Sequence, residues 1–176
     1  MKLRRILESD YETLFRWRND PRIYEWCRQN SPLHWDKHLD WCRAQARDPR
    51  LDMFVMLGDS GNPVGVCGLT DICLINRRAE FSLYIGPEHQ GNGYAYRGLE
   101  KLLEHGFDTL GLNRIYGETF DGNRAQNIFE KMGMVCEGVR RDFYFRCGRF
   151  VNAKLYSISC GEFRDRQKGK ASTGCG

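Results

Sequence analysis

The stretch Tyr84-Ile85-Gly86-Pro87-Glu88-His89-Gln90-Gly91-Asn92-Gly93-Tyr94-Ala95 decides how this sequence is interpreted. An alternating strand pattern, Ala79–Ile85, precedes it, and a helix with an apolar face is expected from Tyr94 to Leu110. Gly91 and Gly93 allow a tight turn and a close backbone approach, and the first N–H groups of a helix attract anions. The stretch therefore predicts a phosphate-binding loop, with a pyrophosphate as its natural ligand.

Three phosphate-binding patterns compete for this loop. The dinucleotide pattern GxGxxG needs a third glycine where Tyr96 stands, and no GxxxxGK[S/T] pattern occurs in the chain. The pattern Q/R-x-x-G-x-G/A fits, as Gln90-Gly91-Asn92-Gly93-Tyr94-Ala95. A plain strand–turn–helix corner remains the structural alternative, because glycine turns are common.

Around this loop the chain predicts one mixed α/β domain with the order β-α-α-β-β-β-α-β-α-β-β. Helices are expected from Ser9 to about Trp17, from Ser31-Pro32 to near Asp48-Pro49, and from Asn123 to Met132, besides the one after the glycine loop. Strand patterns occupy Leu3–Ile6, Met53–Leu57, Val64–Leu69, Ala79–Ile85, Arg114–Phe120, Met134–Val139, Phe143–Arg146 and Phe150–Ile158. We expect the folded domain to span residues 1–160 and residues 161–176 to form a polar, basic tail without regular structure.

Composition excludes several classes of protein. The 176 residues suit one domain, and the net charge of +4 is too small for a large nucleic-acid footprint. No apolar run approaches the ~18 residues of a membrane helix, and no apolar region follows the basic N-terminus. The eight cysteines form no CxxC pair, which favours reduced thiols. We therefore expect a cytoplasmic protein that binds neither nucleic acid nor membrane.

The fitting loop pattern resembles the acyl-CoA loop of the GCN5-related N-acetyltransferases (GNAT). Arg77-Arg78-Ala79-Glu80-Phe81, Gly133-Met134, Tyr144–Phe150 and Trp17-Arg18-Asn19-Asp20-Pro21 resemble one branch of that superfamily. This branch holds ribosomal-protein N-terminal acetyltransferases, spermidine acetyltransferase and nucleotide-amino-sugar acetyltransferases. The resemblance covers about residues 2 to 160. It implies a GNAT fold: about seven strands in a mixed sheet, about four flanking helices, and a V-shaped split between the fourth and fifth strands.

The resemblance also implies a co-substrate, acetyl-CoA, and the places where it binds. Its pantetheine arm would pair with the main chain of Leu83, Tyr84 and Ile85 like an added strand. Its thioester carbonyl would be polarised by a backbone N–H near Tyr84. The remaining cofactor-binding candidates are Gln90, Gly91, Asn92, Gly93, Tyr94, Ala95, Asn123 and Phe129.

Glu80 is the candidate general base, in the position where histone-type members of the superfamily place a glutamate. The alternative is a solvated strand carboxylate or an ion-pair partner of Arg77 or Arg78. Glu118, on the neighbouring predicted strand, is the second candidate. A base is needed because only the neutral amine attacks the thioester.

Two positions depart from the family pattern N-x-x-A-x-x-x-Y-x-x-x-G. Gly122 stands at the asparagine position, with Asn123 beside it, and Phe129 stands at the tyrosine position. The usual tyrosine acid is thus missing. Tyr84, our catalytic candidate, or Tyr116 or Tyr144 could replace it. Solvent could also protonate the CoA thiolate, because a thiol has a pKa of only ~8.5.

Other side chains support weaker hypotheses. His34 and His38 have the i,i+4 spacing of a metal pair but no evident third ligand, so we expect no metal. Trp17, Trp26 and the other early aromatic residues are either core or the wall of an acceptor pocket.

The acceptor amine is not decided by the sequence. A nucleotide-linked amino sugar comes first, a protein N-terminus second, and a polyamine or aminoglycoside third, because the first fifty residues hold more Lys and Arg than Asp and Glu. The rival to an enzyme is a catalytically silent CoA-binding sensor. A homodimer is left open.

Overall fold

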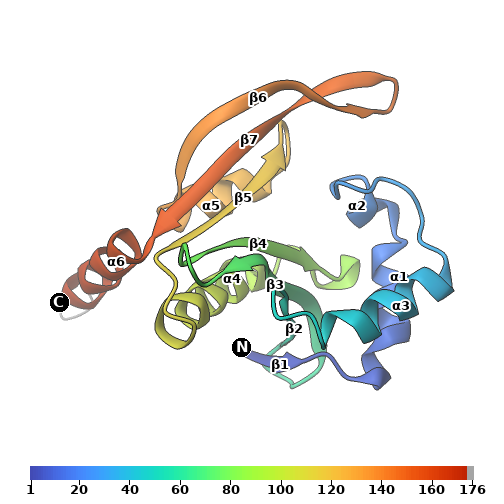
Figure 1. The fold of residues 1–176 in the computed structure, drawn as a ribbon, viewed down its shortest axis with the longest axis horizontal. Coiled ribbons are helices and arrows are strands. Elements are labelled where there is room, and N and C mark those ends of the chain that lie inside the picture. Colours follow the sequence, from blue (N-terminus) through green and yellow to red (C-terminus); the bar gives the residue numbers. More distant parts are fainter. Residues whose placement is uncertain (174–176) are drawn as a thin grey trace.

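A seven-stranded sheet in the order β1-β2-β3-β4-β5-β7-β6 forms the centre of the computed structural model, which describes residues 1–173 (Figure 1). Neighbouring strands are antiparallel except β4 and β5, which are parallel. The strands are β1 (Lys2–Arg5), β2 (Asp52–Leu57), β3 (Pro63–Cys73), β4 (Arg78–Ile85), β5 (Arg114–Phe120), β6 (Val135–Arg146) and β7 (Arg149–Ser159).

Helices cover both faces of the sheet. They are α1 (Tyr11–Arg18), α2 (Pro21–Tyr24), α3 (Trp35–Gln45), α4 (Tyr94–Glu104), α5 (Ala125–Lys131) and α6 (Cys160–Thr173), and a π-helical turn, His105–Thr109, extends α4. The described residues thus hold six α-helices where about four were predicted. The predicted α/β class, the seven strands and the mixed sheet are confirmed.

Strand alternation sorts the core into two clusters, one on each face of the sheet. Ala79, Phe81 and Ile85 of β4 pack in the cluster that α4 covers. Tyr84, from the same strand, packs against the second cluster, which contains Trp17 of α1. Successive side chains of β4 therefore point to opposite faces of the sheet, and Glu80 lies on the face opposite α4.

Two local predictions were wrong, and one short helix was not predicted. The second predicted helix begins at Trp35 with His34 at its N-cap, so Ser31-Pro32 lies outside it. The first helix ends at Arg18, close to the predicted end, and the unpredicted helix α2 follows it, where the Asp20 carboxylate accepts a hydrogen bond from the N–H of Arg22 at 2.9 Å. The two strands expected within residues 134–146 form one bulged strand, β6.

Residues 161–173, which were predicted to lie in a tail without regular structure, form a helix instead. Residues up to Thr173 continue from β7 as α6, and Phe163 is buried against Phe107 with 5.4 Å between ring centroids. Arg166 also donates a hydrogen bond to the Tyr96 hydroxyl of α4 at 2.8 Å, so an apolar and a polar contact attach α6 to the domain. Residues 174–176 of the predicted tail lie outside the described residues, and the domain boundary at residue 160 stays a prediction.

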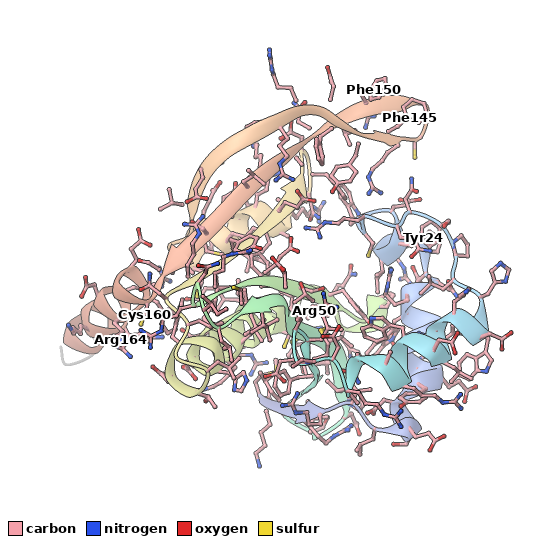
Figure 2. All side chains as sticks on the ribbon, in the orientation of Figure 1. Tyr24, Arg50, Phe145, Phe150, Cys160 and Arg164 are labelled. Atoms are coloured by element: carbon pink, nitrogen blue, oxygen red, sulfur yellow. The ribbon has the colours of Figure 1, made fainter. Side chains whose placement is uncertain are left out.

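Strands β6 and β7 form a long hairpin whose tip extends over the region of α2 (Figure 1). Cys147 and Gly148 make the turn, both with positive φ. Phe145 and Phe150 lie at the tip, with ring centroids 5.1 Å apart (Figure 2). No helix within residues 1–173 has the length and apolar character needed to cross a membrane.

Candidate active site

The sheet splits between β4 and β5. These strands pair only at Arg78–Glu80 with Arg114–Tyr116, although β4 continues to Ile85 and β5 to Phe120. Beyond Glu80 one edge of β4 therefore faces β5 without pairing to it. Such an edge presents free N–H and C=O groups to an extended ligand. The V-shaped split predicted from the sequence is confirmed.

The glycine loop leads from the open end of this split into α4. Gly91 and Gly93 have φ values of 83° and 72°, a region that favours glycine, and Gly93 is the N-cap of α4. The first N–H groups of a helix have no partner inside it, and the first turn of α4 carries no acidic residue. The loop is therefore suited to an anion.

Several contacts fix the shape of the loop. Asn92 Nδ2 donates to the carbonyls of His89 and Gln90 at 3.2 and 3.3 Å, and Gln90 Nε2 donates to Ile85 O at 3.4 Å. The Trp17 indole N–H donates to Glu88 at 2.9 Å and the ring packs against Gly86, where a Cβ would meet it at 2.5 Å. The side chains of Gln90 and Asn92 thus brace the loop.

A pocket of about 120 Å³ opens at the apex of the split. Its walls come from β4, β5, the β6–β7 hairpin and the segment between α2 and α3: Arg28, Glu80, Tyr116, Gly117, Glu118, Glu137, Arg140, Leu155 and Tyr156. Glu80 and Glu118, the two candidate bases, both line it. The structure therefore brings together two carboxylates that stand 38 positions apart in the sequence.

Arg28 joins these two carboxylates. Its Nη1 donates to Glu80 Oε2 at 3.0 Å, its Nη2 also contacts Glu80, and its Nε donates to Glu118 Oε1 at 2.8 Å. Glu118 further accepts hydrogen bonds from Tyr144 and, at 3.1 Å, from Arg140. Burial alone would raise the pKa of Glu118, but the hydrogen bonds from Tyr144 and Arg28 outweigh it and hold the pKa below its usual value.

A family model described as an acetyltransferase (GNAT) domain matches residues 1–135. The chain belongs to the GNAT family. The chain is 27% identical over 169 residues to spermidine N(1)-acetyltransferase of Vibrio cholerae serotype O1, covering 96% of this chain and 98% of that protein. It is 32% identical over 148 residues to the spermidine N(1)-acetyltransferase of Escherichia coli K12, covering 84% and 74%.

Solved structures agree with the sequence relatives. A crystal structure of the Vibrio cholerae spermidine N-acetyltransferase in complex with CoA and spermine has a TM-score of 0.88 and 27% identity to this chain, covering 93% of this chain and 97% of that one. This GNAT protein is therefore an N-acetyltransferase with acetyl-CoA as co-substrate. The predicted family, fold and co-substrate are confirmed, and the enzyme is preferred to the silent sensor.

The three tyrosines that were candidates for the missing acid lie in three different environments. Tyr84 packs beside Trp17 on the face opposite α4, and burial raises its pKa. Burial and a hydrogen bond to Asp71, 2.7 Å long, raise the pKa of Tyr116 to about 12. Burial and the contact with Glu118 raise the pKa of Tyr144. All three therefore stay protonated at neutral pH. Tyr116 is the β5 neighbour of Glu80 in the sheet, and the Tyr144 hydroxyl donates a hydrogen bond to Glu118.

Asn123, beside the departing position Gly122, and Phe129, at the other departing position, have structural uses. Asn123 Oδ1 accepts a hydrogen bond from the N–H of Ala125 at 2.9 Å, which starts α5. Phe129 is 4% exposed, and its ring lies between Phe81 and Tyr156 at centroid distances of 5.0 and 5.4 Å. Their predicted contacts with acetyl-CoA stay predictions.

The histidines and tryptophans do not build the pocket. His38 is buried and its Nε2 lies 2.8 Å from Tyr11 O, and no cluster of metal-ligating residues occurs in the part of the chain that the structure describes. Trp17 is core, whereas Trp26, Trp35 and Trp41 are 45%, 40% and 40% exposed. None of these four tryptophans is among the residues that line the pocket.

Sequence reasoning missed Arg28 and Arg146. Arg28 stands in a polar segment with no recognisable motif, and Arg146 was given no role beyond its place in a predicted strand and in the family-like stretch Tyr144–Phe150. Arg146 is 7% exposed and lies 3.9 Å above the centroid of the Phe120 ring. An arginine that follows two aromatic residues, as in Tyr144-Phe145-Arg146, is the one signal that could have indicated a buried guanidinium.

Proposed function

We propose that this acetyltransferase moves the acetyl group of acetyl-CoA to a primary amine of a cationic small molecule, with a polyamine such as spermidine as the first candidate acceptor. The observation that carries the proposal is the pair Glu80 and Glu118 at the apex of the split, which holds a nitrogen cation, the guanidinium of Arg28. An ammonium group needs the same surroundings. The relatives that act on spermidine, by their names, support the same class of acceptor.

This order of acceptors differs from the one that the sequence favoured. The charge balance of the first fifty residues disfavoured a polyamine, but it did not reveal which carboxylates meet in the pocket. Glu80 and Glu118 come from strands further along the chain, and their side chains are 16% and 5% exposed. Local charge, not the charge of a segment, decides which ligand a pocket attracts.

In this proposal acetyl-CoA lies in the split. Its pyrophosphate would bind the N–H groups from Gly91 to Ala95, and its pantetheine arm would pair with the free edge of Leu83–Ile85. The thioester would then end near the pocket, because the edge runs from the glycine loop back to Glu80. A backbone N–H near Tyr84 and Ile85 would stabilise the negative charge that develops on the thioester oxygen.

Glu80 would act as the general base. The acceptor arrives as an ammonium ion, because a primary amine has a pKa near 10, and gives one proton to the Glu80 carboxylate. The neutral nitrogen attacks the thioester carbon, and as the carbon–sulfur bond breaks the nitrogen gives its second proton to solvent. CoA leaves as a thiolate that takes a proton from solvent, and Glu80 returns to the carboxylate by releasing its proton to solvent. Tyr144, held by Glu118, is a better-placed alternative donor than Tyr84, because only Tyr144 contacts one of the two carboxylates.

The test is a panel of amines offered with acetyl-CoA to the purified protein, with free thiol and acetylated product measured together. We expect spermidine and spermine to be acetylated faster than a nucleotide-linked amino sugar or a peptide N-terminus. If only the nucleotide-linked amino sugar or only the peptide N-terminus were acetylated, that molecule would replace the polyamine as the acceptor. Thermal stabilisation by CoA without thiol release from any amine would favour the silent sensor.

A further inference from the structure

Arg28 occupies the position that the proposed function gives to the acceptor amine. All three of its guanidinium nitrogens contact carboxylates, two of them Glu80 and one of them Glu118. A guanidinium does not release its proton at any ordinary pH. Arg28 donates to both oxygens of Glu80, so the acceptor amine cannot reach this carboxylate while the contact lasts.

The segment that carries Arg28 is held by its backbone. Arg146, at the end of β6, donates to the carbonyl of Arg28 at 3.0 Å and to the carbonyl of Glu25 at 3.3 Å. Arg146 is itself fixed, since its guanidinium is buried against the Phe120 ring. The main chain at Arg28 is thus anchored to the β6–β7 hairpin independently of the Arg28 side chain.

The Arg28 side chain, in contrast, can leave the pocket without disturbing this anchor. It is 53% exposed, whereas the Glu118 carboxylate that it contacts is 5% exposed. A long arginine side chain pivots about its own bonds, so loss of the two ion pairs would release the guanidinium into solvent. Glu118 would keep its ion pair with Arg140 at 3.1 Å, whereas Glu80 would lose the ion pair that Arg28 provides. A cation that enters the pocket would restore a partner to Glu80.

We propose that Arg28 is an internal counter-cation that fills the acceptor site of the free enzyme, and that the substrate ammonium must displace it to reach Glu80. This inference rests on the proposed function, because it assumes that the acceptor amine enters beside Glu80 and Glu118. The exchange replaces one cation by another, so the pocket keeps its charge. Arg28 is then a specificity-determining residue: an acceptor with several ammonium groups can satisfy both carboxylates and compete with Arg28, whereas a neutral acceptor cannot.

The experiment compares steady-state kinetics of the full-length enzyme and its variants with spermidine, or with whichever amine the panel identifies. Arg28→Ala and Arg28→Gln, which remove the competing charge, are expected to lower KM for the amine about tenfold without lowering kcat. Arg28→Lys, which keeps the charge, should stay within twofold of the wild type. Arg22→Ala is the matched control, because Arg22 is an exposed arginine of α2 that pairs with Asp20 outside the pocket.

A KM that rises, or that falls less than threefold, in both Arg28→Ala and Arg28→Gln would overturn the inference. A rise confined to acceptors that carry phosphate would show instead that Arg28 binds the substrate. A purely structural role would lower kcat and the melting temperature, and it would not lower KM. Failure of the proposed function is separate, because it would appear as absence of thiol release by the wild-type enzyme with every amine.

Discussion

The cofactor side and the acceptor side of this site are built in different ways. The loop from Gly86 to Ala95 is one continuous stretch, and its shape follows from two glycines with positive φ and from its own Gln90 and Asn92. The acceptor side combines Arg28, Glu80, Glu118 and the β6–β7 hairpin, which are far apart in the sequence. Local conformation fixes the first side, whereas sheet topology and register fix the second.

This difference explains which part of a functional site can be recognised in a sequence. A backbone site needs particular residues at fixed spacing, and these remain visible as a motif. A side-chain site needs only that several strands pass the same place, so its members share no spacing. The cofactor of an enzyme of this kind can therefore be predicted before its substrate.

The largest expected effect comes from a substitution on the acceptor side of the site. Glu80→Gln keeps the size of the side chain but cannot accept a proton at neutral pH, so kcat should fall ~10²–10³-fold. Acetyl-CoA affinity, measured by calorimetry, should stay unchanged, because Glu80 lies on the face opposite the glycine-loop helix. The loss should shrink at high pH, where the amine is already neutral in solution.

Glu118→Gln is the matched comparison, because it lines the same pocket. A larger loss of kcat in Glu118→Gln than in Glu80→Gln would transfer the role of base to Glu118. Full activity of both variants would mean that no side-chain base is needed.

The next largest effect comes from a substitution on the cofactor side of the site. Gly93→Val puts a branched side chain at φ 72°, where it is strained, and next to the proposed pyrophosphate site. Acetyl-CoA binding should weaken by at least ~2 kcal/mol, about thirtyfold in Kd. Gly61→Val is the control, since Gly61 has φ 82°, open space around it and a place in the β2–β3 turn. Equal losses of acetyl-CoA affinity in the two variants would mean that the glycine loop does not bind acetyl-CoA.

A smaller effect concerns stability and pH. The pKa of Glu118 is lowered in the folded protein, so its stabilising contribution is present above the unfolded pKa of ~4.3 and is lost as the pH falls through the lower folded value. Glu118→Gln should therefore destabilise the protein by ~1–3 kcal/mol at pH 7, as expected for a lost hydrogen bond to a charged group. Urea unfolding at pH 7 and below pH 4 should show the gap between wild type and variant closing. A gap that widens toward acid pH would contradict the assignment.

The smallest effect on rate tests the missing tyrosine acid. Phe129→Tyr restores the family residue but places a hydroxyl in a ring cluster with Phe81 and Tyr156. We expect kcat to change less than threefold, because a thiolate of pKa ~8.5 needs little help to leave. The melting temperature should drop if the hydroxyl finds no partner. A rate gain of tenfold or more would show that the family acid was lost at a cost in activity.

Much of the fold could be predicted from the sequence. The alternation in β4 and the apolar face of α4 are local, and both were assigned correctly. Of the pocket residues, Glu80 was named because the family resemblance places a glutamate at its position, and Glu118 because it lies on the neighbouring strand, and their catalytic roles stay predictions.

What failed depended on contacts between distant residues. The helix after residue 160 depends on Phe163 reaching Phe107, and the position of Arg28 depends on Arg146 of the final hairpin. Neither contact leaves a periodic pattern in the polar segments concerned. Glu118 appeared as a second-choice base, whereas the structure shows it as the partner of Tyr144 in the same pocket.

The narrow seam between β4 and β5 has a consequence for how the chain folds. Short turns join β2 to β3, β3 to β4 and β6 to β7, whereas the seam joins residues such as Glu80 and Tyr116, which are 36 positions apart. Closing a longer loop costs more chain entropy and slows folding. We expect the β2–β4 unit and the β6–β7 hairpin to form before the seam, so the acetyl-CoA site would form only after these units.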